Sequence, residues 1–172
     1  QVNEKVGLTF EKGLRSILRQ DPDIIMIGEI RDTETAEIAV RAAITGHLVI
    51  STIHTEDAVS TIIRLNDMGV KAYLIKASLI GVISQRLVRK KCICCKNIPG
   101  IVEKCELCKG RGYIGRMAIH EIMEINEDIK ETIRDNFDKS RIKDVANKTG
   151  MISFEDSIKE LLENGVLDER EV

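Results

Sequence analysis

Two short apolar runs, separated by a helix-like segment, place the strongest constraint on the fold of this chain. Residues 24–28 form a run that is too short for a typical helix and does not alternate with polar residues, as expected of a parallel strand covered on both faces. Residues 33–44 carry an apolar stripe at helical spacing that ends at Gly46, and residues 47–55 are again strand-like. Such a βαβ unit has parallel strands, so the sequence predicts an α/β fold.

Further elements are predicted from apolar periodicity and from capping residues. A first helix is capped by Thr9, and the last has the capping pattern Ser153-x-x-Asp156 and stops at Gly165. Short strands are predicted at residues 85–89 and 117–125. The predicted helices cover residues 10–18, 57–68, 71–83, 127–135, 140–148 and 154–164.

Size and charge limit the class of protein. The 172 residues, of which 43% are hydrophobic, are enough to fill a core. A net charge of −2 argues against bulk affinity for nucleic acid and against a polybasic membrane anchor. No apolar run approaches the length of a membrane-spanning helix, so we expect a cytosolic protein. The chain begins with Gln1 rather than Met, and we expect it to be a piece of a longer protein.

Each predicted parallel strand is followed by a polar residue that could form a site. Glu29 follows the first strand and His54 follows the second. Ligands of open α/β sheets bind outside the carboxyl ends of the strands. An apolar strand that ends in an acid is typical of a Walker B segment, in which the acid helps to hold hydrated magnesium or orients the water that attacks a terminal phosphate. Alternatively, Glu29 begins a loop or pairs with Arg31, and His54 is structural or exposed. Because no GxxxxGK[ST] phosphate loop occurs in the 172 residues, the chain alone is not expected to hydrolyse ATP.

All five cysteines fall in one short segment, at positions 92, 94, 95, 105 and 108. The pairs Cys92-x-x-Cys95 and Cys105-x-x-Cys108 offer four thiolates, which suit a tetrahedral structural zinc with no open position for catalysis. Disulfides are the alternative, but a cytosolic setting and an odd count argue against them. Cys94 is then either a free thiol or an alternative ligand.

Longer stretches of the chain resemble the secretion ATPase family of type II secretion and type IV pilus assembly. The resemblance rests on LTFEKGLRSILRQDPDIIMIGEIRDTETAEIAVRAAITGHLVISTIHTEDA, on QRLVRKKC, on the paired CxxC motifs and on GYIGR. It implies a RecA-like P-loop NTPase domain that forms a homohexamer and hydrolyses MgATP. It also implies a cytoplasmic protein, peripheral at the inner face of the bacterial cytoplasmic membrane, whose partner is the inner-membrane platform protein.

The resemblance also implies roles for individual residues. Gly28 and Glu29 match the Walker B segment, with Glu29 as the catalytic carboxylate. His54 matches the histidine of the histidine box, and His47 opens that box. Arginines that the family places around the nucleotide or the subunit interface are matched by Arg15, Arg19, Arg31 and Arg116. Without the resemblance these arginines would be interpreted as solvated surface.

The resemblance and the spacing of the cysteines together imply three segments. Residues 1–91 are the later part of the RecA-like ATPase domain, residues 92–116 are a tetracysteine zinc element, and residues 117–172 are a strand plus a helical carboxyl-terminal subdomain. We expect ATP, Mg²⁺ and Zn²⁺ as ligands of the full-length protein.

Two other functions compete with this interpretation. One is a non-enzymatic, zinc-stabilised assembly or docking module. The other is a zinc-ribbon nucleic-acid binder, suggested by the basic residues 86, 89, 90, 91 and 96. The nucleic-acid function is disfavoured because the net charge is negative and only three Phe and two Tyr are present for base stacking.

Overall fold

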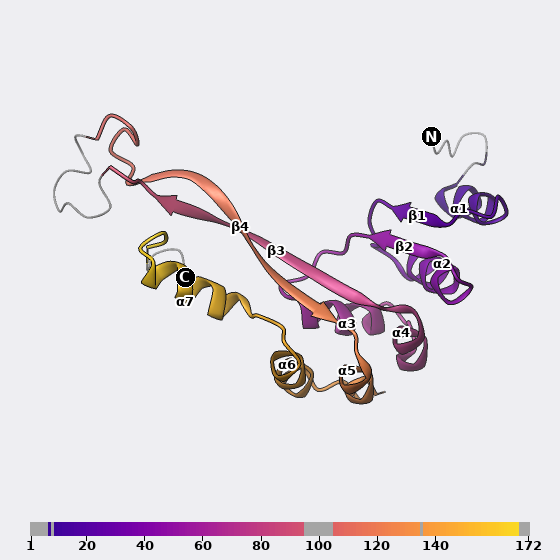
Figure 1. Cartoon of the computed structure of the whole chain (residues 1–172). Helices are drawn as coiled ribbons and strands as arrows, with labels where there is room; N and C mark the ends of the chain where they lie inside the picture. Colours follow the sequence, from indigo (N-terminus) through magenta and orange to yellow (C-terminus); the bar gives the residue numbers. More distant parts are fainter. Residues whose placement is uncertain (1–6, 8, 95–104, 135, 169–172) are drawn as a thin grey trace. The chain divides into compact units, whose positions relative to one another are not determined.

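The computed structural model describes residues 7, 9–94, 105–134 and 136–168 (Figure 1). It divides into two compact units, each built from two stretches that are far apart in the sequence. Unit 1 comprises Gln1–Val82 and Met123–Thr149, and unit 2 comprises Ile83–Ile122 and Gly150–Val172. The segments 1–91, 92–116 and 117–172 follow the order of the chain instead, and they remain a prediction.

Unit 1 contains the predicted βαβ element. Helix α1 (Phe10–Leu18) precedes strand β1 (Ile24–Ile27), helix α2 (Thr33–Ile44) and strand β2 (Leu48–Ser51). The strands pair in parallel, with Ile24 opposite Leu48 and Ile27 opposite Ser51. The predicted α/β class and the predicted parallel pairing are therefore confirmed.

Side-chain caps fix where α1 and α2 begin. Thr9 accepts a hydrogen bond from the backbone of Lys12, and Asp32 accepts one from Thr35. Past the helix ends, Gly46 and Gly69 have φ values of 104° and 89°, which cost glycine little. The other helices of unit 1 are α3 (Ala58–Asp67), α4 (Ala72–Ser78), α5 (Glu127–Thr132) and α6 (Lys139–Lys148).

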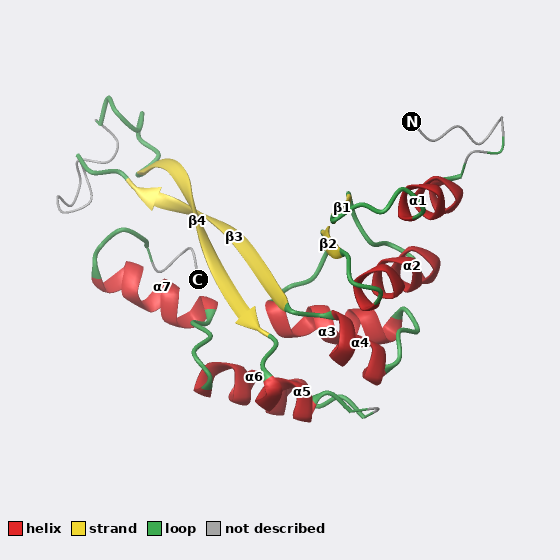
Figure 2. Cartoon of the chain, turned by 45° about the vertical axis from the view of Figure 1, so that its right-hand side comes forward, coloured by secondary structure: helices red, strands yellow, loops and turns green. Residues whose placement is uncertain are grey.

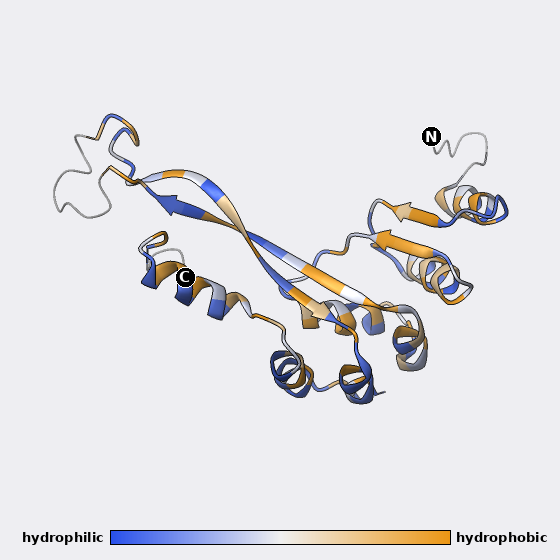
Figure 3. Ribbon diagram, in the orientation of Figure 1, coloured by the Kyte–Doolittle hydropathy of each residue, from blue (hydrophilic) through white to orange (hydrophobic). Residues whose placement is uncertain are grey.

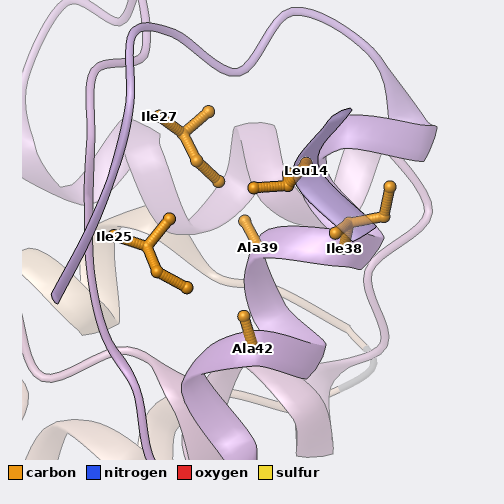
Figure 4. Packing of buried hydrophobic residues seen from close by; sticks show 6 residues of the cluster. All are labelled: Leu14, Ile25, Ile27, Ile38, Ala39 and Ala42. Carbon is orange, nitrogen blue, oxygen red and sulfur yellow. The ribbon is translucent and has the colours of Figure 1, made fainter. Parts of the chain in front are cut away.

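The apolar core around β1 lies on one face of the strand pair. Alternate side chains of β1 point toward α1 and α2, where they meet Leu14 and the small residues of α2 (Figure 4). The residues of this cluster are Leu14, Ile25, Ile27, Ile38, Ala39 and Ala42.

The opposite face of the same strands is open. Met26 is 76% exposed, and Ile24, Leu48 and Ile50 are exposed beside it, although both strands are strongly hydrophobic (Figure 3). The prediction that residues 24–28 are covered on both faces is thus wrong for the residues that the structure describes. Side chains alternate across a strand, and the helices that contact β1 in unit 1 lie on one side only.

Unit 2 is built around a long strand pair and one helix. Strand β3 (Gly81–Lys91) pairs with β4 (Tyr113–Glu124), and the two run antiparallel (Figure 2). Helix α7 (Phe154–Glu163) packs on them through a cluster of Val88, Ile119, Phe154 and Leu167. The buried carboxylate of Glu121 accepts a 3.0 Å hydrogen bond from the backbone of Phe154, which attaches the start of α7 to β4.

The structure shortens two predicted helices, lengthens two predicted strands and confirms one predicted cap. The helix predicted over 127–135 ends at Thr132. The helix predicted over 71–83 ends at Ser78, because Leu79 leaves helical geometry and β3 already begins at Gly81. The strands predicted at 85–89 and 117–125 are parts of the longer β3 and β4. The capping box of Ser153 and Asp156 is confirmed at the start of α7. Among the described residues, no helix is both long and apolar enough to cross a membrane.

Candidate functional site

The carboxyl ends of β1 and β2 bring three polar side chains together. Arg31 Nη2 lies 2.6 Å from Glu29 Oε1, and His54 Nε2 lies 3.4 Å from Glu29 Oε2. The carboxylate is therefore contacted on one oxygen by a guanidinium and on the other by an imidazole. The structure places Glu29 beside His54, as the strand order predicts, and it also shows the pairing with Arg31 that was the alternative interpretation.

Backbone hydrogen bonds set the position of Glu29 relative to the strand that precedes His54. The N–H of Ile30 donates to the carbonyl of Thr52 at 2.9 Å, and the hydroxyl of Thr52 donates to the carbonyl of Gly28 at 2.7 Å. Both chain neighbours of Glu29 are thus attached to Thr52. Since His54 follows Thr52 by two residues, the acid and the imidazole are presented from one hydrogen-bonded ladder.

The charge of Glu29 is stabilised by its neighbours. The hydrogen bond from Arg31 is the main reason that the pKa of Glu29 lies below its ordinary value, and the charge of Arg31 and the contact with His54 add to it. Partial desolvation opposes this shift. Glu29 is therefore ionised at neutral pH, and the side chain of His54, 88% exposed, leaves the pair open to a ligand from solvent.

Replacing Arg31 with alanine is expected to raise the pKa of Glu29, because the carboxylate loses its hydrogen bond and its nearest positive charge. Carbon-13 NMR titration of the Glu29 carboxyl measures this pKa directly. Arg41→Ala is the matched control, since Arg41 pairs with Glu37 at 3.4 Å on α2 and should leave Glu29 unchanged. An unchanged Glu29 pKa in Arg31→Ala would contradict the assigned cause of the shift.

The other three predicted arginines occupy exposed positions. Arg15 is on α1 and lines a shallow groove with residues of α2 that include Thr33 and Glu37. Arg19 is the capping residue that follows α1. Arg116 is on β4, in unit 2. Their proposed contacts with a nucleotide or a second subunit remain predictions.

His47 lies at the opposite end of β2 from His54. Its Nδ1 is 3.0 Å from the carbonyl oxygen of Ala42 and 3.2 Å from the hydroxyl of Thr45, so the ring contacts the last turn of α2. It precedes β2, whereas Glu29 and His54 follow their strands. The structure therefore does not bring His47 together with Glu29, and these contacts assign it a capping role at the end of α2.

Three of the four predicted metal ligands form a buried thiol cluster in unit 2. The sulfur atoms of Cys92, Cys105 and Cys108 all lie within 4.8 Å of one another, and the first two are 3.7 Å apart. This separation is far longer than a disulfide bond of about 2.05 Å. It is close to the ~3.8 Å expected between two thiolates on a tetrahedral zinc with Zn–S bonds of about 2.3 Å. The fourth predicted ligand, Cys95, lies outside the described residues.

The backbone turns tightly just after Cys108. Lys109 and Gly110 have φ values of 52° and 78°, and the N–H of Gly112 lies 3.2 Å from Cys108 Sγ. An N–H aimed at a sulfur stabilises its thiolate form. Cys94, by contrast, is exposed, and partial desolvation together with the thiol of Cys92 raises its pKa. The described part of the cluster thus distinguishes three inward thiols from one exposed thiol.

The sequence did not predict one polar contact of the segment that follows His54. Lys139, on α6, lies 2.8 Å from the carboxylate of Asp57, the capping residue of α3. No local pattern could have revealed it, because a lysine that begins one helix and an aspartate that caps another are each ordinary in isolation.

Comparisons with known proteins agree with the resemblance. A family model described as type II/IV secretion system protein matches residues 1–172. Type IV pilus assembly ATPase PilB of Thermus thermophilus is 48% identical over 173 residues, covering 88% of this chain and 20% of PilB. Type II secretion system protein HxcR of Pseudomonas aeruginosa is 44% identical, covering 96% of this chain and 36% of HxcR. The chain thus spans between a fifth and two fifths of the length of these relatives.

Solved structures of related ATPases share the fold. The X-ray structure of the Legionella pneumophila ATPase DotB superposes with a TM-score of 0.69 at 25% identity, covering 95% of this chain and 41% of DotB. The pilus retraction motor PilT with bound ADP gives a TM-score of 0.57 at 32% identity, covering 95% of this chain and 45% of PilT. With an α/β fold similar to these ATPases and a family match over its whole length, this chain belongs to the type II/IV secretion system protein family.

Proposed function

We propose that this chain is part of an ATPase that powers type IV pilus assembly or type II protein secretion by hydrolysing MgATP. The observation that carries the proposal is the contact of Glu29 with His54 at the carboxyl ends of two parallel strands. The names of PilB and HxcR support it. Because the 172 residues contain no phosphate loop, the activity belongs to the full-length protein, and the chain alone is inactive.

In this function Glu29 is the Walker B carboxylate and orients the water that attacks the terminal phosphate. Its low pKa keeps it ionised, and its backbone is held by Thr52. His54 contacts the terminal phosphate from the next strand, where its exposed ring is accessible. Magnesium, when bound, neutralises charge that develops on the phosphate oxygens. Gly28 completes the Walker B segment, and His47 supports the histidine box by fixing the end of α2 against β2.

Arginine side chains complete the proposed nucleotide site. Arg31 already contacts Glu29 and can exchange that partner for a phosphate oxygen. Guanidinium groups stabilise a transferring phosphoryl group from the same subunit or from a neighbouring one. The exposed positions of Arg15, Arg19 and Arg116 suit contacts with a nucleotide or with a second subunit.

The proposed assembly is a homohexamer of RecA-like domains with ATP bound between subunits. Residues 1–91 supply the later part of that domain, and residues 117–172 supply a strand and a helical subdomain. The hexamer acts in the cytoplasm, at the inner face of the cytoplasmic membrane, on the inner-membrane platform protein. Nucleic acid is not among its partners.

Zinc is the proposed metal of the tetracysteine element, residues 92–116. The buried thiols of Cys92, Cys105 and Cys108 fit it by their spacing and by the softness of sulfur, and Cys95 is the fourth ligand. Four protein ligands leave no position for a substrate, so the metal supplies stability rather than chemistry. It fixes a turn that has only Ile114 packed against it as an apolar partner among the described residues.

Phosphate release by the natural full-length protein tests this function. We expect turnover of ATP that requires Mg²⁺ and disappears with EDTA, from an assembly whose native mass corresponds to six subunits. Zinc content is measured in the same sample. A zinc-loaded assembly without Mg²⁺-dependent phosphate release would contradict the motor function and favour the non-enzymatic docking module.

A further inference from the structure

Lys139, on α6, makes two polar contacts with the start of α3. The ammonium of Lys139 lies 2.8 Å from Asp57 Oδ2 and 2.7 Å from the hydroxyl of Ser60. The other carboxylate oxygen of Asp57 accepts a 2.7 Å hydrogen bond from the backbone N–H of Ser60. Lys139 therefore fixes the side chain that caps α3, although it lies 79 positions from Ser60 in the sequence.

Asp57, which Lys139 contacts, is the last residue of the loop that carries His54. This loop, residues 52–57, is attached at its beginning by Thr52, which bonds to Gly28. At its end the hydroxyl of Thr55 donates to the carbonyl of Asp57 at 3.3 Å and lies 3.0 Å from the hydroxyl of Thr61. His54 stands between these two attachments. The pairing of β1 with β2 thus fixes the beginning of the loop, and Lys139 with its partners fixes the end.

The contact is partly buried: the side chain of Lys139 is 43% exposed, but its partner is better covered. The side chain of Asp57 is only 18% exposed. Burial acts to raise the pKa of Asp57, but the hydrogen bonds from Lys139 and Ser60 outweigh it and leave the pKa below its ordinary value. A carboxylate in such a place loses much when its cation is removed, because the remaining charge is poorly hydrated.

We infer that Lys139 is a positioning residue for the proposed ATPase: it holds Asp57, and through Asp57 it holds the loop that presents His54 to Glu29. Its influence on turnover rests on the proposed function, whereas its influence on the order of the loop does not. The inference also gives α6 a physical connection to the Glu29–His54 pair, because a displacement of α6 that moved Lys139 would break its contact with Asp57.

The test compares Lys139→Met with Lys130→Met in the natural full-length protein. Lys130 is the matched control, since it pairs with Glu127 at 2.8 Å within α5. In Lys139→Met we expect kcat for ATP to fall about tenfold with KM within about twofold, because a misplaced His54 lowers the reactive fraction of bound complexes. Amide hydrogen exchange of residues 52–57 should accelerate about tenfold, the factor that loss of one charged hydrogen bond gives. Lys139→Arg should recover most of both losses.

Two outcomes would overturn the inference. One is hydrogen exchange at residues 52–57 that is no faster in Lys139→Met than in Lys130→Met; the other is a rise in KM with kcat unchanged. If the unmutated protein hydrolyses no ATP, the proposed function fails and the exchange measurement alone decides the role of Lys139. If Lys139→Met does not fold, Asp57→Asn removes the same charge pair and is judged by the same two readouts.

Discussion

Replacing Glu29 with glutamine is expected to lower the MgATP turnover of the full-length protein by about 10²–10⁴-fold, the usual contribution of a positioned acid or base. Glutamine keeps the length and shape of the side chain but cannot carry the negative charge that Arg31 and His54 now surround. Steady-state phosphate release gives kcat, and a fluorescent ATP analogue gives the affinity. Because the change removes charge rather than volume, nucleotide affinity should change by less than about tenfold.

Glu127→Gln provides the control for this prediction. Glu127 also belongs to unit 1 and also pairs with a cation, at 2.8 Å from Lys130, but it lies on α5, away from the strand ends. Its replacement should leave turnover unchanged. If Glu29→Gln kept half or more of the turnover of the unmutated protein, Glu29 would not be the carboxylate that orients the attacking water.

Replacing Cys108 with serine is expected to abolish stoichiometric zinc binding. Structural zinc in small zinc-binding peptides contributes on the order of 10 kcal/mol of folding free energy. Cys108 is fully buried in the cluster and accepts the N–H of Gly112, so serine would replace sulfur at a buried ligand position. Metal content measured by inductively coupled plasma mass spectrometry should fall from one zinc per chain to below about a tenth. Limited proteolysis should then cut within residues 92–112.

Cys94→Ser is the matched control for the metal prediction. It makes the same chemical change two residues from Cys92, but at an exposed position. Zinc content and resistance to proteolysis should both be retained. A Cys108→Ser protein that still holds one zinc per chain would show that the described cluster is not the metal site.

The parts of the fold that could be predicted from the sequence are those with local causes. A helix cap is decided within four residues, so the starts at Thr9 and Ser153 were predictable from side-chain type alone. The parallel pairing of β1 with β2 follows from the helical crossover that joins them. The meeting of Glu29 and His54 follows in turn, because parallel strands end at the same edge.

The parts that could not be predicted depend on contacts between distant segments. The apolar composition of β1 predicts burial on two faces, but the side chains that contact it in unit 1 come from α1 and α2 on one face. Residues 81–83 match a helical pattern, yet their backbone belongs to the ladder with β4. The pair of Lys139 and Asp57 has no sequence signal at all. For β3 and for the pair of Lys139 and Asp57, a partner far along the chain decides the outcome.

Because Thr52 is hydrogen-bonded to both chain neighbours of Glu29, the pairing of β1 with β2 sets the distance between Glu29 and His54. The spacing of acid and imidazole is measured in main-chain steps, so substitutions on the open face of the strands should change it little. An inserted or deleted residue between Leu48 and His54 would act differently. It would shift the histidine by about 3.3 Å and turn it to the opposite face of the sheet. Length variation should therefore be tolerated in the loops at the amino ends of the two strands but not in the short stretch from β2 to His54.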